Sequence, residues 1–120
     1  MSIKSQDKII AQCSSWKEFV AFQDIQLDTT DKGDLFERLV QLFLLTAPQY
    51  KSKLSNVWWP KFEKLPKGVA EHLNLSFPEN GIDLIAKTID GEYWPVQAKY
   101  ESDTTGAKRG EIIRKTMNYL

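Results

Sequence analysis

The sequence predicts a single α/β domain, and three observations lead to that class. The chain has 120 residues, 42% of them hydrophobic, which suits one core of ordinary size. Its first half carries apolar residues at helical spacing, whereas two strand-like runs follow near residues 82–100. The longest apolar stretch, residues 39–47, is too short to cross a bilayer, and the N-terminus lacks the layout of a secretion signal. We therefore expect a cytoplasmic protein with no membrane partner.

Charge and cysteine content exclude several kinds of protein. The 16 Lys and Arg residues balance 16 Asp and Glu residues, so bulk charge cannot hold the chain on nucleic acid. The charges alternate in blocks, however, and residues 41–70 carry 5 basic groups against 1 acidic group. A nucleic-acid partner must therefore be bound locally. The single Cys13 excludes an internal disulfide and a cysteine-based zinc site.

The first helix is expected over residues 7–22, because apolar side chains recur there on one helical face. A break at Ser14-Ser15 is the alternative, since Ser15 and Glu18 match a capping box from which a helix restarts. The sequence leaves both versions open. The residues that share the apolar face are Ile9, Cys13, Trp16 and Val20.

A second helix is expected to begin at Thr29-Thr30-Asp31, whose side chains can accept hydrogen bonds from the first free N–H groups. Leucine and phenylalanine residues give it a broad apolar stripe, and Pro48 should end it. Glu37, Arg38 and Gln41 are expected toward its polar side.

Later segments favour strands. Val57-Trp58-Trp59 predicts a short strand closed by Pro60, and residues 69–73 a short helix. Residues 82–89 and 92–100, joined at Asp90-Gly91, predict a hairpin. A last helix is expected from residue 110, and the chain looks truncated after it.

Charged residues inside this hairpin indicate a site. Gln97 and Lys99 share one face of the second strand, while Val96 and Ala98 lie on the other. Lys99 is costly in an apolar strand unless it is paired or used. Asp83 is likewise embedded in an apolar run on the first strand. The alternative is an edge hairpin whose charges face water.

The length of the hairpin loop decides whether these residues can meet. A two-residue turn at Asp90-Gly91 would set Asp83 opposite Ala98, among apolar side chains. A three-residue loop, 89–91, with Gly91 in the left-handed conformation, would set Asp83 opposite Gln97. A shared site therefore requires this odd loop, another bulge, or a break in pairing near Gly81.

The same residues resemble a known family. Gly81-Ile82-Asp83-Leu84-Ile85-Ala86 followed by Gln97-Ala98-Lys99-Tyr100 resembles the Asp…Gln-x-Lys variant of the PD-(D/E)xK signature in Mrr-like restriction endonucleases. Further landmarks resemble, in order, the N-terminal nuclease domain of single-polypeptide, helicase-containing (type ISP) restriction-modification enzymes. They are Asp31-Lys32-Gly33, Phe36-Glu37-Arg38-Leu39, Pro48-Gln49-Tyr50-Lys51, Val57-Trp58 and Asp90-Gly91-Glu92-Tyr93-Trp94.

The resemblance implies a restriction-endonuclease-like fold, a mixed sheet flanked by helices and truncated at the C-terminus. Residues 1–30 would form an N-terminal helical part, 31–101 the catalytic core, and 102–120 the start of a following helix. Helicase and methyltransferase regions would belong to the same polypeptide or complex.

The resemblance also implies Mg²⁺-dependent hydrolysis of DNA phosphodiesters, with Mn²⁺ able to substitute. Asp83 would be the main metal ligand, joined by the Gln97 side-chain oxygen and the Ala98 carbonyl. Lys99 would orient the attacking water or stabilise transition-state charge. Glu37 matches the family's helical glutamate and would hold a metal-bound water or a second ion. An exposed helix glutamate is the alternative for Glu37.

Basic residues outside the signature are the candidates for DNA contact. Tryptophans beside them, Trp58-Trp59, fit either a DNA-facing surface or the core. A non-catalytic nucleic-acid-binding or interaction module that retains the fold is the alternative function, and metal-dependent cleavage distinguishes the two. The candidate DNA contacts are Lys51, Lys53, Lys61, Lys108 and Arg109.

Overall fold

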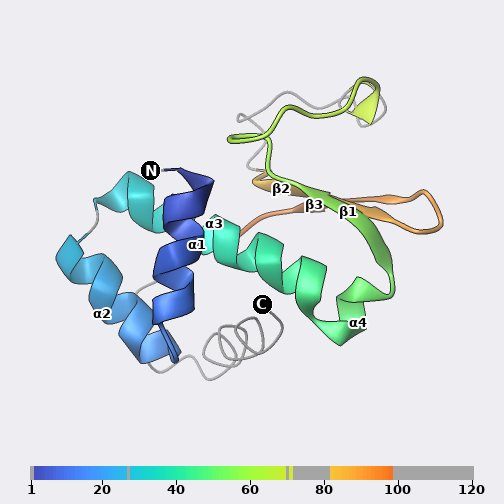
Figure 1. Cartoon of the computed structure of the whole chain (residues 1–120). Coiled ribbons are helices and arrows are strands. Elements are labelled where there is room, and N and C mark those ends of the chain that lie inside the picture. The colour runs from blue at the N-terminus through green and yellow to red at the C-terminus, as the bar shows by residue number, and fades with distance from the viewer. Residues whose placement is uncertain (1, 27, 70, 72–81, 99–120) are drawn as a thin grey trace.

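Helices and a small antiparallel sheet make up the computed structural model, which describes residues 2–26, 28–69, 71 and 82–98. This composition confirms the predicted α/β class. The long helix α3 runs through the middle, with α1 and α2 near its beginning and the sheet near its end (Figure 1). The elements are α1 (Ile3–Gln12), α2 (Trp16–Gln26), α3 (Thr29–Thr46), α4 (Pro48–Lys51), β1 (Leu54–Trp58), β2 (Leu84–Thr88) and β3 (Tyr93–Val96).

The N-terminal segment forms two helices, so the alternative with a break is confirmed and a single helix over 7–22 is wrong. Ser15 starts α2, because its hydroxyl oxygen accepts the N–H of Glu18 at 3.1 Å. The Glu18 carboxylate reaches back to Ser14, accepting the backbone N–H at 2.7 Å and the hydroxyl at 2.8 Å. These bonds satisfy N–H groups that the helix itself leaves free.

Helix α3 begins at Thr29, within the stretch where the sequence predicts its start, but its cap lies one residue earlier. Asp28 is the N-cap, and its carboxylate accepts the N–H of Asp31 at 2.8 Å. Thr29-Thr30-Asp31 therefore form the first turn, and the expectation that they supply the cap is wrong. Pro48 ends the helix as predicted, because it occupies the first position of α4 after the Ala47 C-cap.

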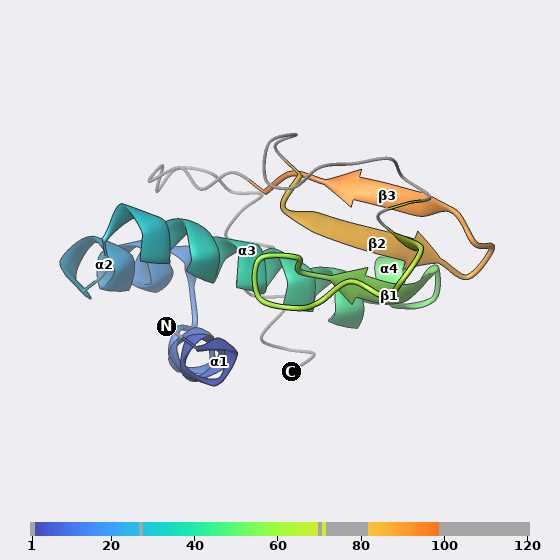
Figure 2. The ribbon, with the colours of Figure 1, turned by 90° about the horizontal axis from the view of Figure 1, so that it is seen from above.

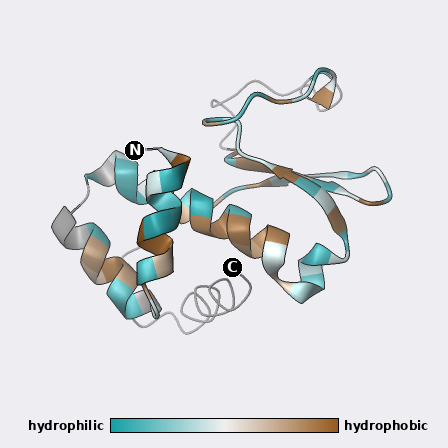
Figure 3. Ribbon diagram, viewed as in Figure 1, coloured by the Kyte–Doolittle hydropathy of each residue, from teal (hydrophilic) through white to brown (hydrophobic). Residues whose placement is uncertain are grey.

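Apolar residues pack in two clusters, and α3 contributes to both. One cluster joins α3 to the N-terminal helices and includes Ile10, Phe19 and Leu39. The other lies between α3 and the sheet and includes Leu44 and Trp59, both buried. Figure 3 shows this apolar character along the second half of α3 and on the strands. One helix therefore fixes the sheet relative to the rest of the chain.

The sheet has the strand order β1-β2-β3, and both pairings are antiparallel. Figure 2 shows β2 between its neighbours, with α3 running beneath one side. Strand β1 begins at Leu54, three residues earlier than predicted, and ends before Trp59. Any parallel strand of the expected mixed sheet lies outside the described residues, as do Lys99, residues 110–120 and most of 69–73.

The hairpin contains the odd three-residue loop, one of the three arrangements that would permit a shared site. Leu84 pairs with Val96 and Ala86 with Trp94, a register that places Asp83 opposite Gln97. The N–H of Thr88 closes the loop on the carbonyl of Glu92 at 2.8 Å, leaving three residues between them. Gly91 has φ +89°, the left-handed conformation expected for this position. The two-residue turn is wrong.

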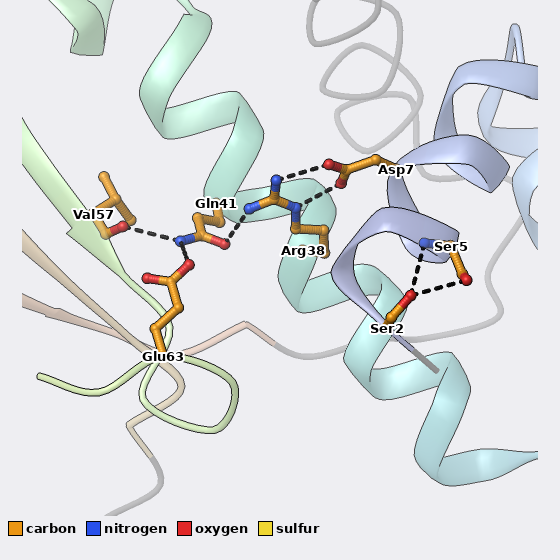
Figure 4. Close-up of polar contacts among 7 residues, drawn as sticks. All are labelled: Ser2, Ser5, Asp7, Arg38, Gln41, Val57 and Glu63. Carbon is orange, nitrogen blue, oxygen red and sulfur yellow. Dashed lines mark hydrogen bonds and ion pairs between the residues drawn. The ribbon is translucent and has the colours of Figure 1, made fainter.

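A partly buried chain of polar contacts links α1, α3 and β1 (Figure 4). Arg38 donates two hydrogen bonds to the Asp7 carboxylate, at 2.7 and 2.9 Å, and a third to Gln41 at 2.8 Å. The Gln41 side-chain amide then donates to the Val57 carbonyl at 2.9 Å and to Glu63 at 3.2 Å. The side of α3 that was expected to be polar does carry polar residues, but it does not face open solvent. Gln41 is only 2% exposed.

Among the described helices, none combines the length and hydropathy needed to cross a membrane.

Candidate active site

Asp83 lies just before β2, where regular strand pairing ends. Its backbone N–H donates to the Val96 carbonyl at 2.9 Å, although the register pairs Val96 with Leu84. Its carboxylate turns toward the end of β3, and Oδ2 accepts the N–H of Ala98 at 2.9 Å. The structure therefore combines the odd loop with an irregularity in pairing. Together they bring Asp83 beside Gln97 and Ala98.

The two β3 partners differ in environment. Gln97 is exposed, so its amide is free to reach a ligand in solvent. Ala98 is half-buried and packs against the cluster between α3 and the N-terminal helices. Its backbone is thereby held against the core at the point where it bonds Asp83. Lys99, the next residue and the expected catalytic lysine, lies outside the described residues.

Glu37 of α3 faces this end of the sheet and is half-buried, so the alternative of an exposed helix glutamate is wrong. Its Oε1 accepts the indole N–H of the fully buried Trp59 at 3.1 Å. The pKa of Glu37 is raised to about 7, chiefly by burial and also by the charges of Asp83 and Asp34, against the lowering effects of the Trp59 hydrogen bond and of Lys61. Glu37 is therefore close to half-protonated at neutral pH.

Asp34 and Lys61 form an ion pair near Glu37. From the sequence, Lys61 was predicted only as a candidate DNA contact, and Asp34 was not predicted. Lys61 follows β1, and its Nζ lies 2.5 Å from Oδ1 of Asp34. The Asp34 side chain is only 8% exposed, whereas that of Lys61 is 51% exposed. The bond to Asp34 raises the pKa of Lys61, and the charges of Glu37 and Asp83 add to that effect. One signal was present in the sequence: Asp34 precedes Glu37 by three residues, so the two share a helix face.

The oxygen donors at this end of the sheet fit a hard divalent cation. Among the described residues, no group of three His, Cys, Asp or Glu side chains is placed to hold a metal. The ligand set that the family resemblance implies, Asp83 with the amide oxygen of Gln97 and the carbonyl of Ala98, would need water to complete the coordination of an ion. Mg²⁺ is commonly bound in this way, by one or two carboxylates with several waters retained. Within the part of the chain that is described, Oδ1 of Asp83 accepts no hydrogen bond.

The expected DNA-contacting residues fall in different places. Lys51 and Lys53 are exposed at the far end of β1, where the Lys53 carbonyl accepts the N–H of Ile89 in the hairpin loop at 2.9 Å. Lys61 lies at the Asp83 end, paired with Asp34. Lys108 and Arg109 lie outside the described residues. Trp59 belongs to the core, so an open aromatic surface at Trp58-Trp59 is wrong for this residue.

The fold and the site define an α/β protein with an oxygen-rich site at one end of a hairpin, beside a helical glutamate. A restriction endonuclease family model of the Mrr type matches residues 45–112, more than half of the chain, and the chain belongs to this family. The matched range includes Asp83 and Gln97, whereas Glu37 precedes it. Membership indicates a nuclease that acts on DNA. Comparisons with curated proteins and with solved structures find no significant match.

Proposed function

We propose that the chain is a Mg²⁺-dependent endonuclease domain that hydrolyses DNA phosphodiester bonds, with Mn²⁺ able to replace Mg²⁺. The observation that carries this proposal is the hairpin register, which sets Asp83 beside Gln97 and Ala98. A regular two-residue turn would have set Asp83 opposite Ala98, on the face away from Gln97. Family membership supplies the substrate class, and the oxygen donors supply the reason for a divalent metal.

Each side chain of the proposed site would have a different role. Asp83, with the oxygens of Gln97 and Ala98, would hold the ion, which supplies Lewis-acid activation of water and phosphate when bound. Lys99 follows these residues directly, and its ammonium would orient the attacking water or stabilise charge on the phosphate. Glu37 has a pKa of about 7, so it can accept or hold a proton at neutral pH, as a general base requires.

The wider context is part of the same proposal. The landmarks between residues 31 and 101 support a nuclease domain of a type ISP restriction-modification enzyme. In that setting a helicase and a methyltransferase belong to the same polypeptide or complex, and the protein works in the cytoplasm.

A non-catalytic DNA-binding module is the second candidate, and one observation favours it. Gln97 stands where the wider superfamily carries an acidic residue, so the site has one carboxylate fewer for a metal. Cleavage with and without metal separates the two functions.

The deciding experiment compares two aspartates of the same hairpin. Asp83→Asn keeps the side-chain volume and an oxygen that can accept the Ala98 N–H, but it removes the charge needed for a metal. Asp90→Asn makes the same change in the exposed loop at the far end. Nicking of supercoiled plasmid with Mg²⁺ or Mn²⁺ should fall by roughly 100-fold or more in Asp83→Asn. Mutation of a residue that only hydrogen-bonds a metal ligand already lowers activity by about 10- to 100-fold, and Asp83 is itself the proposed ligand. Asp90→Asn should cleave like the unmodified chain.

Thermal unfolding of both variants checks that the fold is kept. Undiminished cleavage by Asp83→Asn would contradict the assignment of the metal site. Metal-independent DNA binding by the unmodified chain, with no cleavage under either metal, would establish the non-catalytic module instead.

A further inference from the structure

The segment that follows β1 carries lysines at every third position. Residues 60–69, here named the lysine loop, place Lys61, Lys64 and Lys67 on the exposed side. Lys64 and Lys67 have no ion-pair partner within the described ranges. Phe62 and Glu63, between the first two lysines, are half-buried. The lysine loop therefore exposes its lysine side chains to solvent and packs Phe62 and Glu63 against the rest of the fold.

The inner side fixes the backbone of the lysine loop. The N–H groups of Phe62 and Glu63 both donate to the Trp59 carbonyl, at 3.0 and 2.8 Å. The Phe62 ring packs against the Trp59 ring with centroids 4.2 Å apart. The Glu63 carboxylate accepts a hydrogen bond from Gln41 of α3 at 3.2 Å. At the other end Val69 is 5% exposed. The lysines therefore project from an ordered base.

The lysine loop adjoins the candidate active site. It leaves the sheet at Trp59, whose indole N–H donates to Glu37, and its first lysine bonds Asp34. Lys51 and Lys53 precede β1 and lie at the opposite end of that strand, roughly 17 Å away for five extended residues. The start of the lysine loop and the pair Lys51 and Lys53 therefore lie at different ends of β1.

We infer that the lysine loop is a binding surface for the phosphate backbone of duplex DNA, with Lys64 and Lys67 as the phosphate contacts. The inference rests on the proposed function and identifies the surface that brings DNA to it. Exposed ammonium groups fit phosphates as point charges, without regard to base sequence. The aromatic rings of this region are turned inward, so the loop offers charge without the stacking platform that single strands use.

The test is the salt dependence of binding to a short duplex of arbitrary sequence, without divalent metal and in the Asp83→Asn background. Each lost phosphate contact should reduce the slope of log affinity against log salt by about 0.9. The double variant Lys64→Ala/Lys67→Ala should therefore reduce the slope by about 2. Lys61 is left in place, because its removal would leave the buried Asp34 carboxylate unpaired.

Two further double variants carry the same loss of charge. Lys4→Ala/Lys8→Ala removes two exposed lysines of α1 and should leave the slope unchanged. Lys51→Ala/Lys53→Ala removes those at the opposite end of the sheet and should reduce it by less than the loop variant does. Thermal unfolding verifies the fold of each.

An unchanged slope in the loop variant would overturn the inference, as would an equal or larger effect of the Lys51/Lys53 pair. Binding of single-stranded DNA as tight as that of duplex, with the same dependence on Lys64 and Lys67, would overturn the assignment to duplex. Because binding is measured without cleavage, failure of the lysine loop is distinguishable from failure of the nuclease assignment, which the Asp83 experiment decides.

Discussion

Glu37 illustrates how the folded environment changes the chemistry of a single residue. In the sequence it is one of several charged residues of an amphipathic helix. In the structure Trp59 fixes one of its oxygens, while burial and the neighbouring carboxylates of Asp34 and Asp83 oppose its charge. Helical spacing indicates Asp34 as a neighbour. It could not predict Trp59 and Asp83, which follow β1 and precede β2, far from Glu37 in sequence. Asp83 and Gln97 could be predicted, because polar residues in apolar strand runs are visible locally.

Replacing Glu37 with glutamine should stabilise the metal-free protein at alkaline pH. Folding raises the pKa of Glu37 from 4.5 to about 7, so the folded chain binds more protons than the unfolded chain between these values. Stability contributed by this group therefore falls as the pH rises through that window. Glutamine does not titrate, so Glu37→Gln should be more stable at pH 8 by on the order of 1 kcal/mol, after allowance for solvent screening.

Denaturant unfolding with a chelator, at pH 5 and at pH 8, measures the effect. Glu18→Gln is the control of opposite sign, because hydrogen bonds from Ser14 lower the pKa of Glu18. That variant should be less stable than the unmodified chain at pH 8. A Glu37→Gln protein whose stability keeps the full pH dependence of the original would contradict the raised pKa.

At the scale of elements, helices and hairpin followed from local signals, while their exact ends did not. Pro48 and Gly91 could be predicted because proline cannot continue a helix interior, whereas glycine readily adopts the left-handed conformation that this loop requires. The cap of α3 was displaced by one residue, since Asp28, Thr29, Thr30 and Asp31 are all capable of capping and only the folded chain selects among them. The break between α1 and α2 was likewise one of two versions that the sequence permitted.

Two glycine substitutions should change stability in opposite directions. Gly91 has φ +89°, so Gly91→Ala forces a side chain into the left-handed region and should cost about 1 kcal/mol. Gly33 lies within α3, where an added Cβ would meet only Glu37 Oε2 at 3.9 Å, an ordinary contact. Gly33→Ala should therefore stabilise by about 0.5 to 1 kcal/mol. Urea unfolding measures both, and a neutral Gly91→Ala would contradict the three-residue loop.

For the whole molecule, the polar chain from Asp7 to Glu63 unites parts that the hydrophobic pattern treats separately. Gln41 is its central member, bonded to Arg38, to the Val57 carbonyl and to Glu63. The α/β class and the place of the sheet could be expected from the order of elements. This connection could not, since it joins residues of α1, α3, β1 and the lysine loop through partners that no local pattern specifies.

Removing Gln41 should destabilise the entire fold. Gln41→Leu leaves Arg38 with one partner fewer and deprives the Val57 carbonyl and Glu63 of a buried donor, which should cost on the order of 2 kcal/mol. Gln49→Leu, at an exposed position of α4, should change the free energy of unfolding by less than about 0.5 kcal/mol. Equal effects of the two variants would contradict a structural role for the network.

The three-residue loop has a consequence for how this protein tolerates change. Surface hairpin tips are ordinarily where insertions and deletions accumulate, because little depends on them. Here the loss of one residue between Thr88 and Glu92 would shift strand pairing by one position and turn every side chain of β3 to the other face. The tip never approaches Asp83, yet its length should be as constrained in evolution as the residues at the opposite end of the sheet.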